Sequence, residues 1–169
     1  MDALRFWGDW MTSRNPPSER AVDRYAEATD AVEVGRLDDL EDLYAGCLTE
    51  LEATDPHRAA PANHNLAVVL QQRDDLDGAL FHCVRALFLY HRVGDLPGTW
   101  AGLRNLAIVF QARGENRRAM DARRKAAHVR SRMVESGRFG DSEDGRDGRG
   151  EPLLLLAVSA GRRLRAVGD

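Results

Sequence analysis

The chain has 169 residues, of which 43% are hydrophobic and 30% are charged, and its formal net charge is −3. These values are typical of a folded, soluble protein with one hydrophobic core, and they exclude a wholly disordered chain. The charge is unevenly spread. Residues 1–55 carry 14 acidic and 5 basic residues, a net of −9, whereas residues 56–135 carry 13 basic and 7 acidic residues, a net of +6. This polarity can orient partners or join copies of the chain into a homo-oligomer.

The compartment is inferred from three features of the sequence. The N-terminus lacks the basic start and long apolar run of a secretory signal. The longest apolar run, residues 153–158, is far too short to span a bilayer. Two cysteines form no disulfide framework, which favours a reducing compartment. We therefore expect a cytoplasmic protein with no transmembrane segment.

Apolar residues recur at helical spacing along most of the chain, and no segment alternates with a period of two, so we expect an all-α protein. The first helix is expected within residues 1–15, where Phe6, Trp7 and Trp10 would cap the following helices or dock on a partner. After an interruption at residues 54–61, the pattern resumes. The remaining expected helices are residues 18–34, 37–53, 61–72, 76–92, 98–112 and 116–135.

Two segments follow the last of these helices. Residues 136–150 consist almost entirely of glycine and charged residues, and they are expected to be a disordered linker because they have too little apolar surface to bury. Residues 151–169 are apolar first and basic afterwards, which predicts a short helix or tail. This tail could cap the helices, dock on a partner or lie on a membrane surface.

The segment that begins at residue 65 recurs forty residues later. Alignment of residues 65–87 with residues 105–127 gives eight identities in 23 positions. Alanine is repeated at two helical positions, so that Ala67 and Ala79 in one copy correspond to Ala107 and Ala119 in the other. Small residues at such positions let two helices of a hairpin approach closely, whereas bulky residues would hold them apart.

This pattern resembles the tetratricopeptide repeat, with a weaker copy at residues 25–47. The period of forty, and the segment "GDLPGTWAGLRNLA", are more similar to kinesin light chains and to repeats of bacterial STAND-type regulators. The resemblance implies a right-handed superhelix of antiparallel helix hairpins with an N-terminal capping helix. Its three repeats would be residues 18–55, 58–95 and 98–135.

The resemblance also implies a concave groove that binds a peptide segment or a partner's helix, with no enzymatic activity and no cofactor. Side-chain amides suit this role because they both donate and accept hydrogen bonds. Alternatively, Asn65 and Asn105 bond neighbouring helices and maintain repeat geometry. The candidate peptide-binding residues are His64, Asn65, Val68, Gln71, Arg104, Asn105, Ile108 and Gln111.

Other functional signals in the sequence are weaker. The basic last helix could dock on nucleic acid or another polyanion, and the protein could also be an accessory scaffold to an enzyme or assembly. The histidines form no metal-ligand pattern, so no metal is expected, and both cysteines fall on apolar helix faces. The candidate polyanion-binding residues are Arg117, Arg118, Arg123, Arg124, Lys125 and Arg132.

Overall fold

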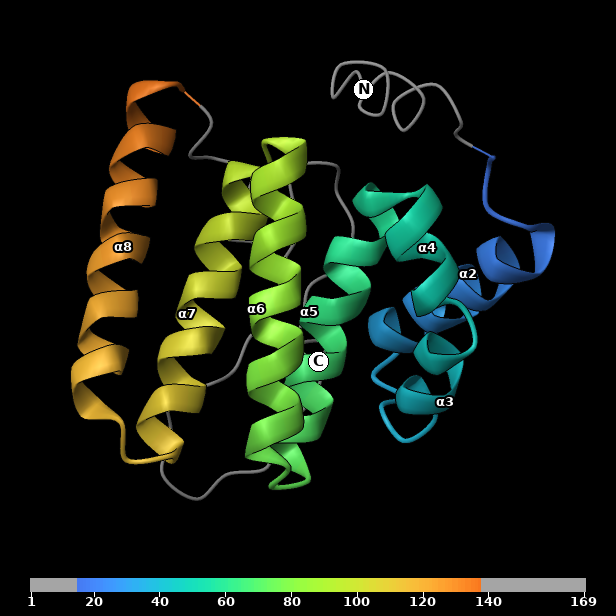
Figure 1. The fold of residues 1–169 in the computed structure, drawn as a ribbon, viewed down its shortest axis with the longest axis horizontal. Coiled ribbons are helices and arrows are strands. Elements are labelled where there is room, and N and C mark those ends of the chain that lie inside the picture. Colours follow the sequence, from blue (N-terminus) through green and yellow to red (C-terminus); the bar gives the residue numbers. More distant parts are fainter. Residues whose placement is uncertain (1–14, 138–169) are drawn as a thin grey trace, which may run out of the picture.

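The computed structural model describes residues 15–137; the expected N-terminal aromatic helix, nearly all of the linker and the C-terminal tail lie outside the described residues. Every regular element between residues 15 and 137 is a helix, which confirms the all-α class (Figure 1). The seven helices of this part are α2 (Glu19–Glu33), α3 (Leu40–Ala45), α4 (Leu48–Thr54), α5 (Pro56–Gln72), α6 (Leu76–Val93), α7 (Leu96–Ala112) and α8 (Asn116–Glu135).

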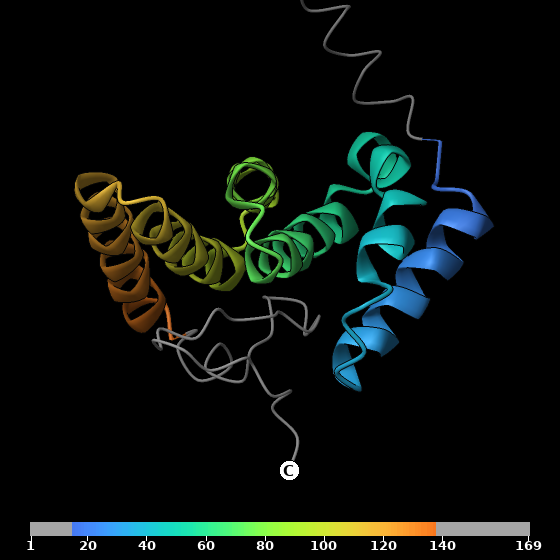
Figure 2. The same cartoon turned by 90° about the horizontal axis from the view of Figure 1, so that it is seen from below.

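The four long helices α5 to α8 pack one against the next in chain order. Helix α5 also contacts α3, α4 and α7, so it is surrounded by neighbours. In the end-on view, α6 lies over α5 and α7, and the helices together form an arch (Figure 2). Because α5 has neighbours on all sides, every residue from Ala59 to Leu70 is buried. None of the helices between residues 15 and 137 combines the length and the apolar content needed to cross a membrane.

Helix α2 forms as the sequence predicts. Its N-cap is Ser18, whose side-chain oxygen accepts a hydrogen bond from the Ala21 amide at 3.2 Å. The helix ends before Gly35, which has the positive φ of 74° that glycine adopts without strain. Its buried residues are Ala21, Tyr25, Ala28, Ala31 and Val32, which recur at helical spacing.

The expected single helix over residues 37–53 is wrong, because the chain forms two short helices there. Helix α3 ends at Ala45, and Cys47 between the two helices has a non-helical backbone, with φ −130° and ψ −21°. Gly46 at the junction has a low helix propensity. The break changes the direction of the chain. Apolar side chains of both helices are still buried, including Tyr44 and Leu51. Periodicity alone does not detect such a bend.

The expected interruption at residues 54–61 is also wrong, because α5 begins inside it. The Asp55 side chain accepts a hydrogen bond from the Arg58 amide at 3.2 Å and so caps the helix. Pro56 occupies the first turn, where its missing N–H would have no partner in any case. Pro61 lies within the helix, at the cost of one backbone hydrogen bond. Pro56 therefore starts the helix and Pro61 lies within it, so neither proline interrupts α5.

The forty-residue offset is repeated in the backbone of two turns. After α5, the amide of Asp75 donates to the carbonyl of Leu70 at 2.9 Å; after α7, Glu115 donates to Phe110 at 2.8 Å. The residues at the left-handed position of these turns are Asp74, with φ 64°, and Gly114, with φ 76°. The two copies thus end their first helices in the same way, although one uses glycine and the other does not.

The alanines that recur in the two copies lie between packed helices, as predicted. Ala67, Ala79, Ala107 and Ala119 are each at most 1% exposed, and they belong to the contacting pairs α5–α6 and α7–α8. A second close approach, between α6 and α7, was missed. There, a methyl group on Gly98 would overlap the ring of Tyr90.

Candidate binding groove

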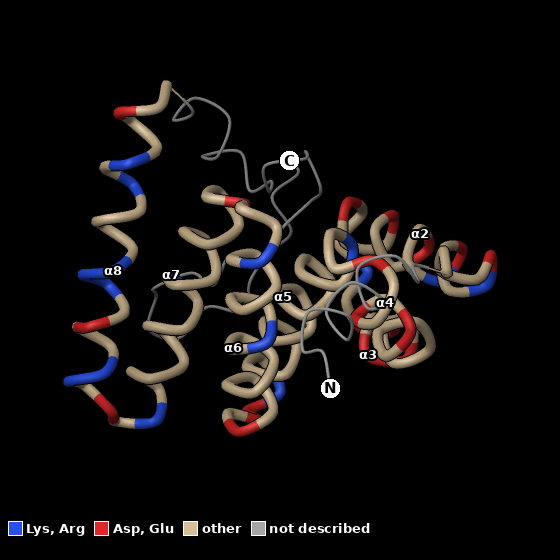
Figure 3. The backbone as a smooth tube through the Cα atoms, turned by 45° about the horizontal axis from the view of Figure 1, so that its top comes forward, with Lys and Arg blue, Asp and Glu red and all other residues tan. Residues whose placement is uncertain are grey.

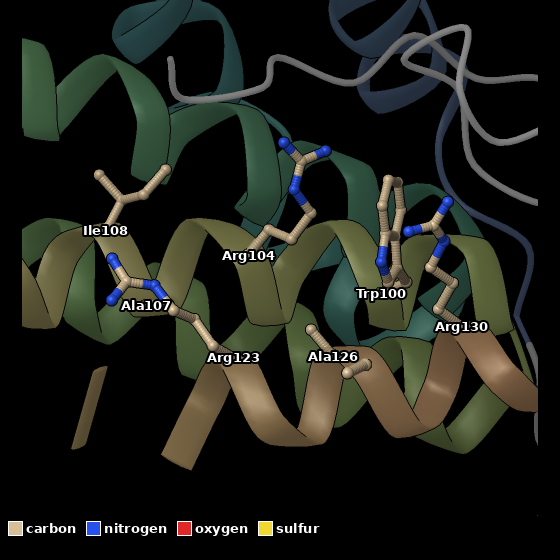
Figure 4. A pocket seen from close by; sticks show the side chains of 8 residues that line it. Trp100, Arg104, Ala107, Ile108, Arg123, Ala126 and Arg130 are labelled. Carbon is tan, nitrogen blue, oxygen red and sulfur yellow. The ribbon is translucent and has the colours of Figure 1, made fainter. Parts of the chain in front are cut away.

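A groove of about 620 Å³ runs between α7 and α8. Helix α7 contributes an indole ring, one arginine and two apolar side chains, and α8 contributes two arginines and two alanines (Figure 4). The lining residues recur every three to four positions along each helix, which is why they share a face. They are Trp100, Arg104, Ala107, Ile108, Arg123, Ala126, Ala127 and Arg130.

The groove is basic, since three of its eight lining residues are arginines and none is acidic. The Arg104 guanidinium lies over the Trp100 ring, 4.7 Å from its centroid, in a cation–π contact. In the close-up view, Trp100 rises between Arg104 and Arg130 (Figure 4). Arg123 donates a hydrogen bond to the side-chain oxygen of Gln111. The positive groups therefore stand beside a flat apolar wall, an arrangement that suits an anionic ligand with apolar parts.

Sequence reasoning found only part of this groove. Arg104 and Ile108 were predicted as peptide contacts and Arg123 as a polyanion contact, and the structure brings these three together. Trp100 and Arg130 were missed. Trp100 precedes Arg104 by four residues and Arg130 follows Arg123 by seven, so helical spacing could have found both.

Four of the predicted peptide contacts are buried: His64, Asn65, Val68 and Asn105 are each at most 2% exposed. The Asn65 amide nitrogen donates to the Tyr44 hydroxyl at 3.2 Å, and the Asn105 amide nitrogen lies 3.0 Å from Nε2 of His64. These bonds join α5 to α3 and α7 to α5. The two asparagines thus bond neighbouring helices, which was the alternative considered for them.

The other two predicted peptide contacts lie outside the groove lining. Gln71 near the end of α5 is half-buried, and Gln111 near the end of α7 is exposed. Gln111 nevertheless touches the groove indirectly, because it accepts the hydrogen bond of Arg123.

The six candidate polyanion contacts on α8 are all exposed, as predicted for a basic helix. Figure 3 shows its basic residues, in blue, at several levels along the helix. Some of them already have acidic neighbours: Arg118 pairs with Glu115 at 2.7 Å, and Arg124 with Asp121 at 3.7 Å. Of the six, Arg123 alone lines the groove.

A polar cluster that the sequence did not reveal joins α4, α5 and α6. Fully buried Asn63 donates to Glu52 at 2.9 Å, and its amide oxygen lies 2.8 Å from Nδ1 of His82. Burial favours a higher pKa for Glu52, but hydrogen bonds from Arg85 and Asn63 outweigh it, so this pKa lies below its ordinary value. Burial lowers the pKa of His82, although the Glu52 carboxylate opposes it. The cluster therefore links α4, α5 and α6 through side-chain hydrogen bonds.

Both cysteines are free and buried, as predicted. Burial raises the pKa of the Cys47 thiol to about 11, with a smaller opposing effect from Arg24. Burial raises the pKa of the Cys83 thiol to about 12. Since only the thiolate is reactive, both side chains act as small apolar groups at neutral pH.

Comparison of the chain with models of protein families, with curated proteins and with solved structures finds no match.

Proposed function

We propose that the protein is a non-enzymatic binding module whose groove between α7 and α8 holds an acidic peptide segment of a partner protein. The observation that carries the proposal is a groove whose eight lining residues include three arginines and no acid, with one of the arginines, Arg104, in cation–π contact with an indole ring. A planar guanidinium donates two parallel hydrogen bonds to a carboxylate, so arginine is well suited to glutamate and aspartate side chains.

The apolar part of the groove defines the rest of the ligand. Trp100 presents a flat wall, while Ile108 and Ala126 leave room for an apolar side chain beside the arginines. A ligand that matches these groups carries carboxylates and at least one apolar side chain. An acidic peptide with interspersed leucines meets this description, and an inorganic anion does not.

We propose in addition that residues 18–135 form a tetratricopeptide-like array with a right-handed superhelix. The support is the forty-residue offset, which recurs in the turns at Asp74 and Gly114 and in the alanines between paired helices. Arrays of this type bind peptides between successive helices. The forty-residue period and the break between α3 and α4 are departures from the thirty-four-residue repeat. Cytoplasmic location is part of the same proposal, since both cysteines are free.

Docking of nucleic acid on α8 is the second candidate function. It is favoured by the seven basic and two acidic residues of this helix, a net of +5. Two features favour the peptide instead. Arg118 and Arg124 already pair with acidic residues of the same chain, and a single aromatic residue lines the groove, whereas single-strand tracks stack successive bases on several rings.

The test measures binding of a short fluorescent peptide of glutamates and leucines to the full chain by anisotropy. Arg123→Glu and Arg124→Glu form a matched pair, because they make the same charge change at adjacent positions of α8. Only Arg123 lines the groove, whereas the Arg124 side chain is 75% exposed outside it. We expect Arg123→Glu to weaken binding about tenfold or more and Arg124→Glu to weaken it about twofold or less.

Two further arms separate the alternatives. Trp100→Ala should weaken the leucine-containing peptide more than a peptide in which serine replaces leucine, because only the former uses the apolar wall. Equal losses with Arg123→Glu and Arg124→Glu would reject the groove. Preference for duplex DNA over the peptide, with a steep loss of binding in salt, would replace the peptide by a polyanion.

A further inference from the structure

The outward side of α6 carries an apolar stripe that the groove does not use. Phe81, Val84 and Phe88 are 61%, 51% and 52% exposed, respectively. Steps of three and four residues place them on one face of the helix, opposite the face that buries Ala86 and Leu89. In the end-on view, α6 lies over α5 and α7 on the outer side of the arch (Figure 2). Large apolar side chains clustered on an exposed helix face mark an interaction surface.

Charged residues of opposite sign lie at the two ends of this stripe. Asp77, whose side chain is 89% exposed and forms an ion pair with Arg113 of the same chain, precedes Phe81 by four residues. Arg92 follows Phe88 by four residues, and its guanidinium carbon lies 5.8 Å from the centre of that ring. The face of α6 therefore runs from acidic through apolar to basic. A second helix with the same order would match it only if the two helices ran in opposite directions.

We propose that this face binds a second copy of the chain, with the two α6 helices antiparallel about a two-fold axis. In that arrangement Asp77 of each copy lies beside Arg92 of the other, and the phenylalanines of both copies share one apolar seam. A parallel pairing would place like charges together. The two-fold contact also uses the same surface of both copies, so it gives a dimer and does not extend into a larger assembly. The net charge of −3 is small enough not to oppose the association.

This dimer differs from the head-to-tail homo-oligomer that the charge polarity of the sequence suggested. Joining the acidic N-terminal region of one copy to the basic C-terminal region of the next is a heterologous contact, which forms open chains unless a ring closes. The α6 contact also leaves the groove between α7 and α8 outside the interface. Failure of the dimer would therefore leave peptide binding untouched, and failure of peptide binding would leave the dimer untouched.

The test is sedimentation velocity of the full chain from about 1 to 200 µM, a range that captures dimers held by a small interface. We expect the wild type to shift from monomer to dimer within this range. Phe88→Asp should weaken the dimer about 100-fold, because the change occurs twice at one interface. Val134→Asp is the matched control, since Val134 is 56% exposed on α8, and it should leave the association unchanged.

Charge reversal tests the antiparallel direction. Asp77→Arg and Arg92→Asp should each weaken the dimer about tenfold, and the double reversal in one chain should restore it, because both cross-pairs are then re-formed with inverted sign. Thermal melts of each variant separate loss of folding from loss of association. If the single substitutions weakened the dimer only by destabilising the fold, the double reversal would not restore dimerisation.

Several outcomes would overturn the proposal. A wild type that stays monomeric over the whole range rejects the second copy. If Phe88→Asp then also shifted tryptophan emission to longer wavelength, the occupant of the face would be the chain's own residues 1–14, which hold two of its three tryptophans. A dimer that resists Phe88→Asp, or that the double reversal fails to restore, would place the interface elsewhere.

Discussion

Asn105 of α7 bonds His64 of α5, with its amide nitrogen 3.0 Å from Nε2 of the imidazole and both side chains buried. The two residues are 41 positions apart, so the bond joins helices that belong to different copies of the repeated segment. It forms part of the contact between α5 and α7. A buried hydrogen bond of this kind couples the packing of successive helices. Its loss should lower the free energy of unfolding more than it lowers the affinity for a peptide.

Asn105→Ala should accordingly lower the free energy of unfolding by about 1–3 kcal/mol, because it leaves the buried imidazole without this partner. Urea denaturation followed by circular dichroism measures the change. Gln111→Ala is the control on the same helix; as an exposed residue it should change stability by less than about 0.5 kcal/mol. An Asn105→Ala variant of wild-type stability, with weakened peptide binding, would return this residue to the ligand-binding surface.

Gly98→Ala should lower the free energy of unfolding by about 1–3 kcal/mol, since the added methyl group would overlap the buried Tyr90 ring. Gly102→Ala is the comparison one turn further along α7. There the methyl group would meet Cδ2 of Leu87 at 3.0 Å, the end of a flexible side chain, and alanine also favours the helix. Thermal denaturation of both variants should therefore rank Gly102→Ala as the more stable. The reverse order would contradict the close approach of α6 and α7.

Asp74→Gly and Gly114→Ala should have opposite effects, although both residues occupy the left-handed position of equivalent turns. Asp74 has φ 64°, a conformation that glycine adopts more readily, so Asp74→Gly should stabilise the protein by about 0.5 kcal/mol. Gly114→Ala should destabilise it by about 1 kcal/mol through backbone strain alone, since nothing lies within 4 Å of the added methyl group. Denaturant midpoints measure both changes. Shifts of the same sign would show that the two turns are not equivalent.

The cluster around Asn63 predicts that the protein becomes less stable as the pH is lowered. The pKa of His82 is lower in the folded chain than the ordinary value of 6.5, so the unfolded chain binds the proton first as pH falls below that value. The His82 contribution is therefore present above about pH 6.5 and is lost as the pH falls toward the folded pKa. Glu52 acts in the same direction below 4.5, its ordinary value, because its folded pKa is also lowered.

Urea denaturation between pH 7.5 and 5.5 isolates the histidine contribution. His82→Gln should show a shallower loss of stability over this window than the wild type, since glutamine does not titrate. The exposed His91→Gln variant serves as the control on the same helix. Identical slopes for wild type and His82→Gln would show that His82 does not couple folding to pH.

Local sequence determined the long helices and the turns between them. The apolar spacing of residues 76–92 and 116–135 corresponds closely to α6 and α8, and Ser18 caps α2 at the expected start of that helix. Caps and helical periodicity depend on residues that are only a few positions apart, so they can be predicted from the sequence. The break at Gly46 and the early start of α5 at Pro56 were missed, because a bend and a helix-starting proline leave the apolar period almost unchanged.

Tertiary packing alone decided which polar side chains are available to a ligand. Helical spacing grouped Asn105 with Arg104 among the candidate peptide contacts, but adjacent residues of a helix lie about 100° apart, so one can be buried while the next lines a groove. Contacts of α5 with four other helices bury His64 and Val68, whereas the equivalent Arg104 and Ile108 of α7 line the groove beside α8. Repeated sequence thus specified equivalent positions, and the number of helices around each position specified whether it holds the fold together or faces a ligand.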